Sequence, residues 1–265
     1  MKKAIGILLA GVLSASAVIT SFGSTLGNYT PQDVLDNLEA GEELAADVDE
    51  QALNGVCRLT EMIAGICLTN ADEDQLANLT QNINDLNEEL ADESLETESK
   101  LGFAACELVN VLETLAREFD TDGSHAADID GIRSAFDEEG AAITTGDEQY
   151  VNALRYSVFM AAYCTVCSCS TQEEAAQIAA GIEEFNTDWA NAEGDARKQV
   201  ASRWLYKMIG AMVKLQVPDN ASAIDTITES TEALVEEAQG PKQASVNWLY
   251  SAVRAASGLT GTLTV

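Results

Sequence analysis

Histidine, proline and aromatic residues are scarce in this chain of 265 residues. His125 is the only histidine, so sites built from several histidines are excluded and a Ser–His or Cys–His pair has one possible location. The chain contains no G-x-S-x-G, no Gly-rich phosphate loop, no H-E-x-x-H and no C-x-x-C-H. Aromatic residues account for 6% of the chain, whereas a sugar-binding cleft usually carries several. We therefore predict that the protein is not an enzyme and carries no cofactor.

Positive charge is also scarce, with 14 Lys or Arg against 44 Asp or Glu and a formal net charge of −30. Nucleic acids and anionic lipids are bound mainly through Lys and Arg, so neither is an expected partner. An acidic surface is also an ordinary way for a protein to stay soluble outside a cell. The acid is concentrated early, since residues 30–98 hold 19 Asp or Glu and a single base, Arg58.

The first 17 residues have the pattern of a secretory signal peptide. Lys2 and Lys3 precede the apolar segment Ala4–Leu13, and Ala15-Ser16-Ala17 offers a cleavage site. The apolar segment has about half of the roughly 20 residues that a membrane-spanning helix needs. We expect cleavage near Ala17 and export to a periplasmic or extracellular location, with an uncleaved anchor as the alternative. No later segment is long and apolar enough to insert into a membrane.

The remaining chain has the pattern of an all-α protein. Apolar residues recur three or four positions apart in stretches rich in Ala, Leu, Glu and Gln, and the three prolines fall between these stretches. Residues 18–29 are expected to be a flexible segment and residues 259–265 a strand-like tail. We predict helices over Thr30–Leu44, Glu50–Leu68, Asn70–Leu90, Ser99–Phe119, Ala126–Ala142, Tyr150–Cys164, Ala175–Trp189, Ala196–Leu215, Ser222–Ala238 and Gly240–Gly258. Capping boxes are expected at Thr145 with Glu148 and at Ser170 with Glu173.

The predicted helices alternate between more apolar and more acidic ones. Trp204-Leu205-Tyr206 recurs as Trp248-Leu249-Tyr250, and alignment of the apolar helices reveals one equivalent position, occupied by Cys57, Cys106, Tyr156, Tyr206 and Tyr250. A repeat of about 44–50 residues is typical of helical arrays. We therefore predict a single domain over residues 30–258, made of stacked antiparallel helical hairpins in an α-solenoid-like array. A compact up-and-down helical bundle is the alternative.

Six cysteines in an exported chain indicate disulfide bonds. The disulfide candidates are Cys57, Cys67, Cys106, Cys164, Cys167 and Cys169. Cys57 and Cys106 occupy equivalent repeat positions, so the sequence suggests that they face each other. The spacing of Cys164 and Cys167 permits a local bridge, a pairing with Cys67 or Cys169, buried free thiols, or a metal or redox site.

Two further clusters of charged residues are candidate sites. The aspartates of the loop between residues 120 and 130 are the only cation-ligand candidates, although the spacing does not match an EF-hand: Asp120, Asp122, Asp128 and Asp130. A basic group in one of the last apolar helices is a candidate docking patch for an acidic partner: Arg197, Lys198, Arg203, Lys207 and Lys214.

The sequence thus favours a non-enzymatic protein-interaction or structural module of the cell envelope. Its partner would be an unidentified protein or a second copy of the chain, because helical arrays present extended binding surfaces. The alternative is a helical protein that binds a small ligand or a divalent cation.

Overall fold

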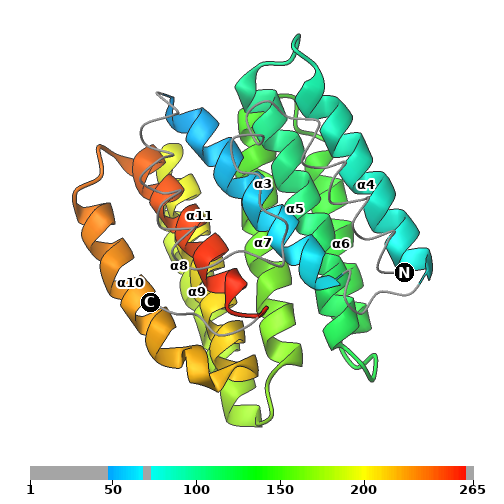
Figure 1. Cartoon of the computed structure of the whole chain (residues 1–265), viewed down its shortest axis with the longest axis vertical. Coiled ribbons are helices and arrows are strands. Elements are labelled where there is room, and N and C mark those ends of the chain that lie inside the picture. Colours follow the sequence, from blue (N-terminus) through cyan, green and yellow to red (C-terminus); the bar gives the residue numbers. More distant parts are fainter. Residues whose placement is uncertain (1–46, 68–72, 261–265) are drawn as a thin grey trace.

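The computed structural model describes residues 47–67 and 73–260 (Figure 1), and within these ranges every regular element is a helix. The predicted all-α class is therefore confirmed. The predicted signal peptide, the segment 18–29, the helix Thr30–Leu44 and residues 261–265 of the tail lie outside the described residues. Within the described ranges, no helix is long and apolar enough to cross a lipid bilayer.

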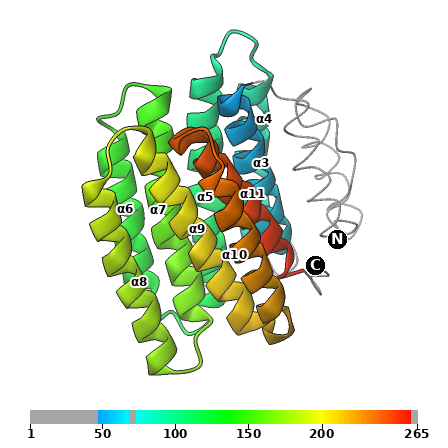
Figure 2. The ribbon, with the colours of Figure 1, turned by 90° about the vertical axis from the view of Figure 1, so that its left-hand side faces the viewer.

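An inner layer is formed by α3 (Val48–Cys67), α5 (Thr97–Phe119), α7 (Gly146–Cys167), α9 (Asp195–Gln216) and α11 (Pro241–Ser257). Each of these helices packs against the next, and α11 also packs against α3, so the contacts run in a closed cycle. An outer layer is formed by α4 (Glu73–Ala91), α6 (Ala126–Gly140), α8 (Gln172–Asn191) and α10 (Ala221–Glu236), and a short 3-10 turn, η2 (Pro218–Asn220), precedes α10. Figure 2 shows α6, α8 and α10 lying outside α7, α9 and α11.

The inner helices begin at the same end of the molecule. Gly146 at the start of α7 lies against the backbone of Glu98 at the start of α5. Lys198 in the first turn of α9 forms an ion pair with Asp147 of α7, and Lys242 of α11 forms one with residue 49 of α3. The outer helices therefore return the chain from one end to the other.

Burial distinguishes the two layers. Inner helices are buried over much of their circumference, as the fully buried Leu112, Leu154 and Leu205 illustrate. An outer helix buries only a narrow stripe, which in α8 is reduced to Phe185. A helix that is apolar on most sides is stable only inside a fold, whereas an amphipathic one covers it from outside. The alternation of more apolar and more acidic helices along the sequence therefore corresponds to the inner and outer layers.

The equivalent repeat position contacts the outer layer in two units. The hydroxyl of Tyr206 hydrogen-bonds with the carbonyl oxygen of Ile224 at 3.1 Å and with Thr228 Oγ1 at 2.7 Å, both on α10. In the preceding unit, the ring of Tyr156 packs on Phe136 of α6 with centroids 5.4 Å apart. In these two units the position is thus a contact between layers.

Of the two predicted helix caps, one is confirmed and the other is shifted by one residue. The Thr145 side chain accepts a hydrogen bond from the Glu148 amide, as predicted, and α7 begins at residue 146. The second capping box, however, joins Thr171 with Glu174 and not Ser170 with Glu173. The Glu174 carboxylate accepts hydrogen bonds from the backbone amides of both Ser170 and Thr171. Helix α8 therefore begins at Gln172, one residue later than a cap at Ser170 would give.

Candidate interaction surface

Acidic and basic residues are sorted between the two layers. Helices α4, α6 and α8 each carry five Asp or Glu and α10 carries four, whereas Arg133 is the one base in these four helices. The inner helices carry eleven Lys or Arg and ten Asp or Glu. The inner layer is therefore nearly neutral, and the negative charge of the described helices lies on the outer layer, where it faces solvent.

Basic side chains of the inner layer form ion pairs with acidic side chains of the outer layer in three places. Arg117 of α5 contacts Asp130 of α6 at 2.7 Å, and Arg155 of α7 contacts the Glu139 carboxylate of α6 at 3.0 Å. Lys214 of α9 contacts the carboxylate of residue 225 in α10 at 2.6 Å. These contacts are partly exposed, so each contributes at most about 1 kcal/mol to stability.

Many outer carboxylates remain without a basic partner. Within the described part of the chain, no Lys or Arg lies within 4.0 Å of Glu183 on α8 or of Glu229 and Glu236 on α10, and all three side chains are exposed. Leu234 is the one exposed large hydrophobic side chain among the described residues. The exposed surface of these helices therefore carries charged groups and few large apolar side chains.

Two of the five predicted docking-patch bases are already paired. Lys198 is 4% exposed and its ammonium group contacts both Asp147 and Asp195, where the latter distance is 2.9 Å. Lys214 donates to the Asp225 carboxylate. A buried lysine between two carboxylates stabilises the start of α9 and is not accessible to a partner.

The other three bases lie nearer the surface. The guanidinium of Arg197 lies over the Trp189 ring, 5.3 Å from its centroid, and the ammonium group of Lys207 lies 4.0 Å from the centroid of Trp204. Burial, with a smaller contribution from Arg203, lowers the pKa of Lys207. The structure therefore does not gather the five bases into one exposed patch.

The aspartates of the α5–α6 loop have separate contacts. The Asp120 carboxylate accepts the backbone amide of His125 at 3.1 and 3.2 Å, and Asp122 accepts the amide of Ser124 at 3.0 Å. The Asp128 carboxylate lies 3.8 Å from His125 Nδ1, and Asp130 binds Arg117. Over residues 47–67 and 73–260, no three His, Cys, Asp or Glu side chains are grouped as metal ligands would be.

All six candidate disulfide cysteines have free thiols in the structure. Cys106 accepts a hydrogen bond from Gln149 of α7 at 3.4 Å, whereas Cys57 lies near Tyr250 of α11. The predicted Cys57–Cys106 bridge is therefore absent, because Cys106 faces α7 and Cys57 lies near α11.

The remaining cysteines gather near the ends of the inner helices. Cys67 and Cys164 are buried, and their thiols donate to the carbonyl oxygens of Val111 at 3.6 Å and Leu112 at 3.4 Å. Cys167 and Cys169 follow at the end of α7 and are half-buried. Burial raises the pKa of each of these four thiols, most strongly in the case of Cys164, so they are protonated at neutral pH.

Known proteins give no further information about this surface. No family model, no curated protein sequence and no solved structure matches the chain.

Proposed function

We propose that the chain is an exported, non-enzymatic protein built from repeated helical hairpins, and that it serves as a protein-interaction or structural module of the cell envelope. We further propose that the outer faces of α8 and α10 bind a basic protein. The sorting of charge between the layers supports this proposal, since it leaves exposed carboxylates on α8 and α10 without a basic partner.

Such a surface favours fast, salt-sensitive association. A field of one sign attracts an oppositely charged partner over about 10 Å at ionic strengths near 0.1 M. Because the surface has few exposed large apolar side chains, little hydrophobic area would be buried, and affinity would depend on complementary charge. The same field would make two copies repel each other through their outer faces, so a basic partner fits this surface better than self-association does.

The carboxylates of α8 and α10 provide the test. A variant that neutralises three unpaired acids, E183Q/E229Q/E236Q, is compared with a control that neutralises three exposed acids elsewhere, E88Q/E93Q/E138Q. The mature chain and both variants are immobilised and exposed to the envelope fraction of the source cells. We expect a basic protein to be retained by the mature chain and the control, lost from the first variant and released by salt. Equal retention by both variants, or no basic protein in any eluate, would contradict the proposal.

Export requires its own measurement. We expect the protein in the envelope or the medium with an N-terminus that begins shortly after Ala17, as cell fractionation and mass spectrometry would show. A cytosolic protein that retains Lys2 and Lys3 would contradict the proposed export.

The divalent-cation alternative has less support. Each carboxylate of the α5–α6 loop contacts a backbone amide, the histidine or an arginine, so ligands would have to leave these contacts to bind a cation.

A further inference from the structure

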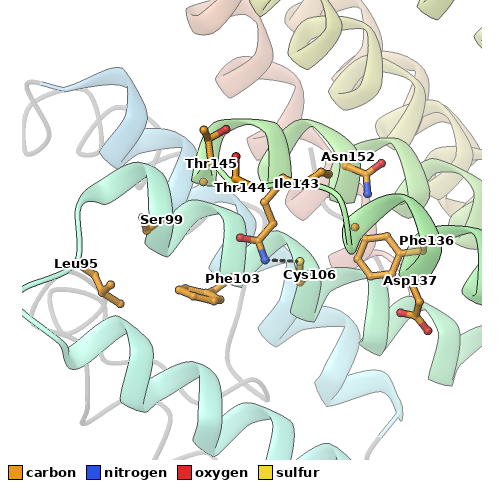
Figure 3. Close-up of a pocket in the computed structure, with 13 residues that line it drawn as sticks. Leu95, Ser99, Phe103, Cys106, Phe136, Asp137, Ile143, Thr144, Thr145 and Asn152 are labelled. Carbon is orange, nitrogen blue, oxygen red and sulfur yellow. Dashed lines mark hydrogen bonds between the residues drawn. The ribbon is translucent and has the colours of Figure 1, made fainter.

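A cavity of about 450 Å³ opens between the start of α5, the end of α6 and the start of α7 (Figure 3). Its size is within the range of about 300–1,000 Å³ that is usual for small-molecule sites. Its apolar wall is formed by Leu95, Phe103, Phe136 and Ile143. The cavity is separate from the acidic faces of α8 and α10.

The cavity results from the unequal spacing of the three helices. A Cβ atom on Gly146 would lie 2.5 Å from the carbonyl oxygen of Glu98, and one on Gly102 would lie 2.9 Å from Gln149 Oε1. These two glycines let the starts of α5 and α7 touch. Helix α6 contacts α7 through Phe136, whose ring packs on that of Tyr156 with centroids 5.4 Å apart. The space between the touching pair and α6 remains open.

Asn152 contributes a carboxamide group to the lining of this cavity. Its side chain is 9% exposed, and Figure 3 shows its carboxamide among the lining residues, on the side of Phe136. Among the residues that the structure describes, none forms a hydrogen bond with this carboxamide. The polar atoms of this carboxamide are open to the cavity, so a molecule that enters can form hydrogen bonds with them.

The remaining lining is close to neutral. Asp137 is the one charged lining residue, and its carboxylate is paired with Arg133 at 3.1 Å. Gln149 Nε2 donates to Cys106 Sγ at 3.4 Å, as the dashed line in Figure 3 shows. Burial raises the pKa of the Cys106 thiol, so it is mostly protonated at pH 7 and reacts slowly as a nucleophile.

We propose that this cavity binds a small uncharged molecule whose apolar body carries an amide-like edge. The carboxamide of Asn152 offers one acceptor and two donor hydrogens, which complement a group that both donates and accepts. The wall that includes Phe103 and Phe136 would hold the apolar body, and the neutral lining disfavours an anion or a cation. This site is independent of the partner proposed for α8 and α10.

Benzamide and benzoate are suitable probes, because they have the same ring and differ in charge and in donor hydrogens. Saturation-transfer NMR with the mature protein should show benzamide binding at least about tenfold tighter than benzoate binding. Alkylation of the Cys106 thiol by N-ethylmaleimide, followed by peptide mass spectrometry, should be slower with benzamide present. That protection would place the ligand in this cavity.

Three variants complete the test. N152L should weaken benzamide binding about tenfold, because it removes the hydrogen-bonding groups at nearly constant volume. S99F, which fills the cavity from its half-buried edge, should abolish binding while the circular dichroism spectrum is unchanged, so the test does not depend on N152L folding. N186L, an exposed asparagine of α8, should have no effect. Absence of benzamide binding to the mature protein, or equal binding to N152L and N186L, would overturn the proposal.

Discussion

Lys242 at the start of α11 donates to both carboxylate oxygens of Asp49 at the start of α3, at 3.0 and 2.9 Å, although the residues are 193 positions apart. This contact joins the last described helix to the first described one. It is accompanied by close packing of the same two helices, in which a Cβ on Gly55 would lie 3.2 Å from Leu249 Cβ. Both contacts lie between α3 and α11, where the cycle of inner helices closes.

The first prediction separates the ion pair from the packing at this closure. K242M should lower the free energy of unfolding by no more than about 1 kcal/mol, because the lysine is partly exposed. G55L should lower it by more than about 2 kcal/mol, because the added atoms must displace Leu249. Urea unfolding of both variants measures the difference. A larger loss in K242M than in G55L would show that the packing of α3 on α11 is not tight.

The second prediction concerns the contact between α5 and α7. The space for a Cβ on Gly146 is occupied by the backbone of Glu98 and Ser99, which cannot move aside as a flexible side chain does. G146A should therefore destabilise the protein by about 2–4 kcal/mol. The matched control is G131A in the middle of α6, where no atom lies within 4 Å, and it should stabilise the protein by up to about 1 kcal/mol. Thermal melts of both variants show whether each is less stable or more stable than the wild type.

The third prediction tests the capping box at α8. T171A should cost about 1 kcal/mol, because it removes the acceptor of the Glu174 amide hydrogen bond of 3.2 Å. S170A should cost less, since its hydroxyl contacts the same carboxylate but caps no amide of the helix. Urea midpoints of the two variants decide between the observed start of α8 and the one predicted from Ser170.

The fourth prediction is a pH dependence from Glu107. Its carboxyl group is 5% exposed, and burial raises its pKa from 4.5 to about 7, opposed by a hydrogen bond from Asn110 at 2.8 Å and by the charge of Arg133. Between pH 4.5 and 7 the unfolded chain releases this proton and the folded chain keeps it, so the contribution of this group to stability is lost as pH rises.

The E107Q variant isolates that contribution. Gln cannot ionise and its carbonyl oxygen still accepts from Asn110, so E107Q should gain about 2–3 kcal/mol relative to wild type between pH 4.5 and pH 8. Thermal or urea unfolding at several pH values measures the difference. E138Q removes a carboxylate at an exposed position of α6 and is the matched control. A difference between E107Q and wild type that does not change with pH would refute the prediction.

The fifth prediction concerns the thiols. Cys67 and Cys164 are fully buried, whereas Cys167 and Cys169 are half-buried, so maleimide should modify the latter pair first in the native protein. Cys67 and Cys164 should react only after unfolding. Peptide mass spectrometry without reductant measures the order of labelling, and a mass loss of two hydrogens in any peptide pair would identify a disulfide.

The sequence predicts the helices well because their boundaries depend on local chemistry. Thr145 caps α7 as expected, because its hydroxyl acts on an amide three residues away. The alternation of apolar and acidic stretches likewise predicts which helices are buried, since burial follows from the composition of each stretch. These features need no knowledge of distant contacts.

The sites are less predictable because distant contacts create them. Lys198 belongs to a basic cluster in the sequence, but its partner Asp147 is 51 positions away, and that contact buries the lysine. The cavity next to Asn152 depends on two glycines that bring α5 and α7 together, and nothing in the spacing of Gly102 and Gly146 indicates that they meet. The acidic residues of the outer helices are evident in the sequence. Their exposure to solvent is evident only when the structure shows which helices form the outer layer.

The closed cycle of inner helices also constrains how this architecture can change in length. An open stack can gain a hairpin at either end through one new interface and lose one just as easily. In a cycle of five inner helices, an inserted hairpin would first have to separate two packed neighbours and then alter the angle between every pair. Duplication of a unit is therefore not a gradual path to a larger homologue, and variation in size is expected in the loops between layers.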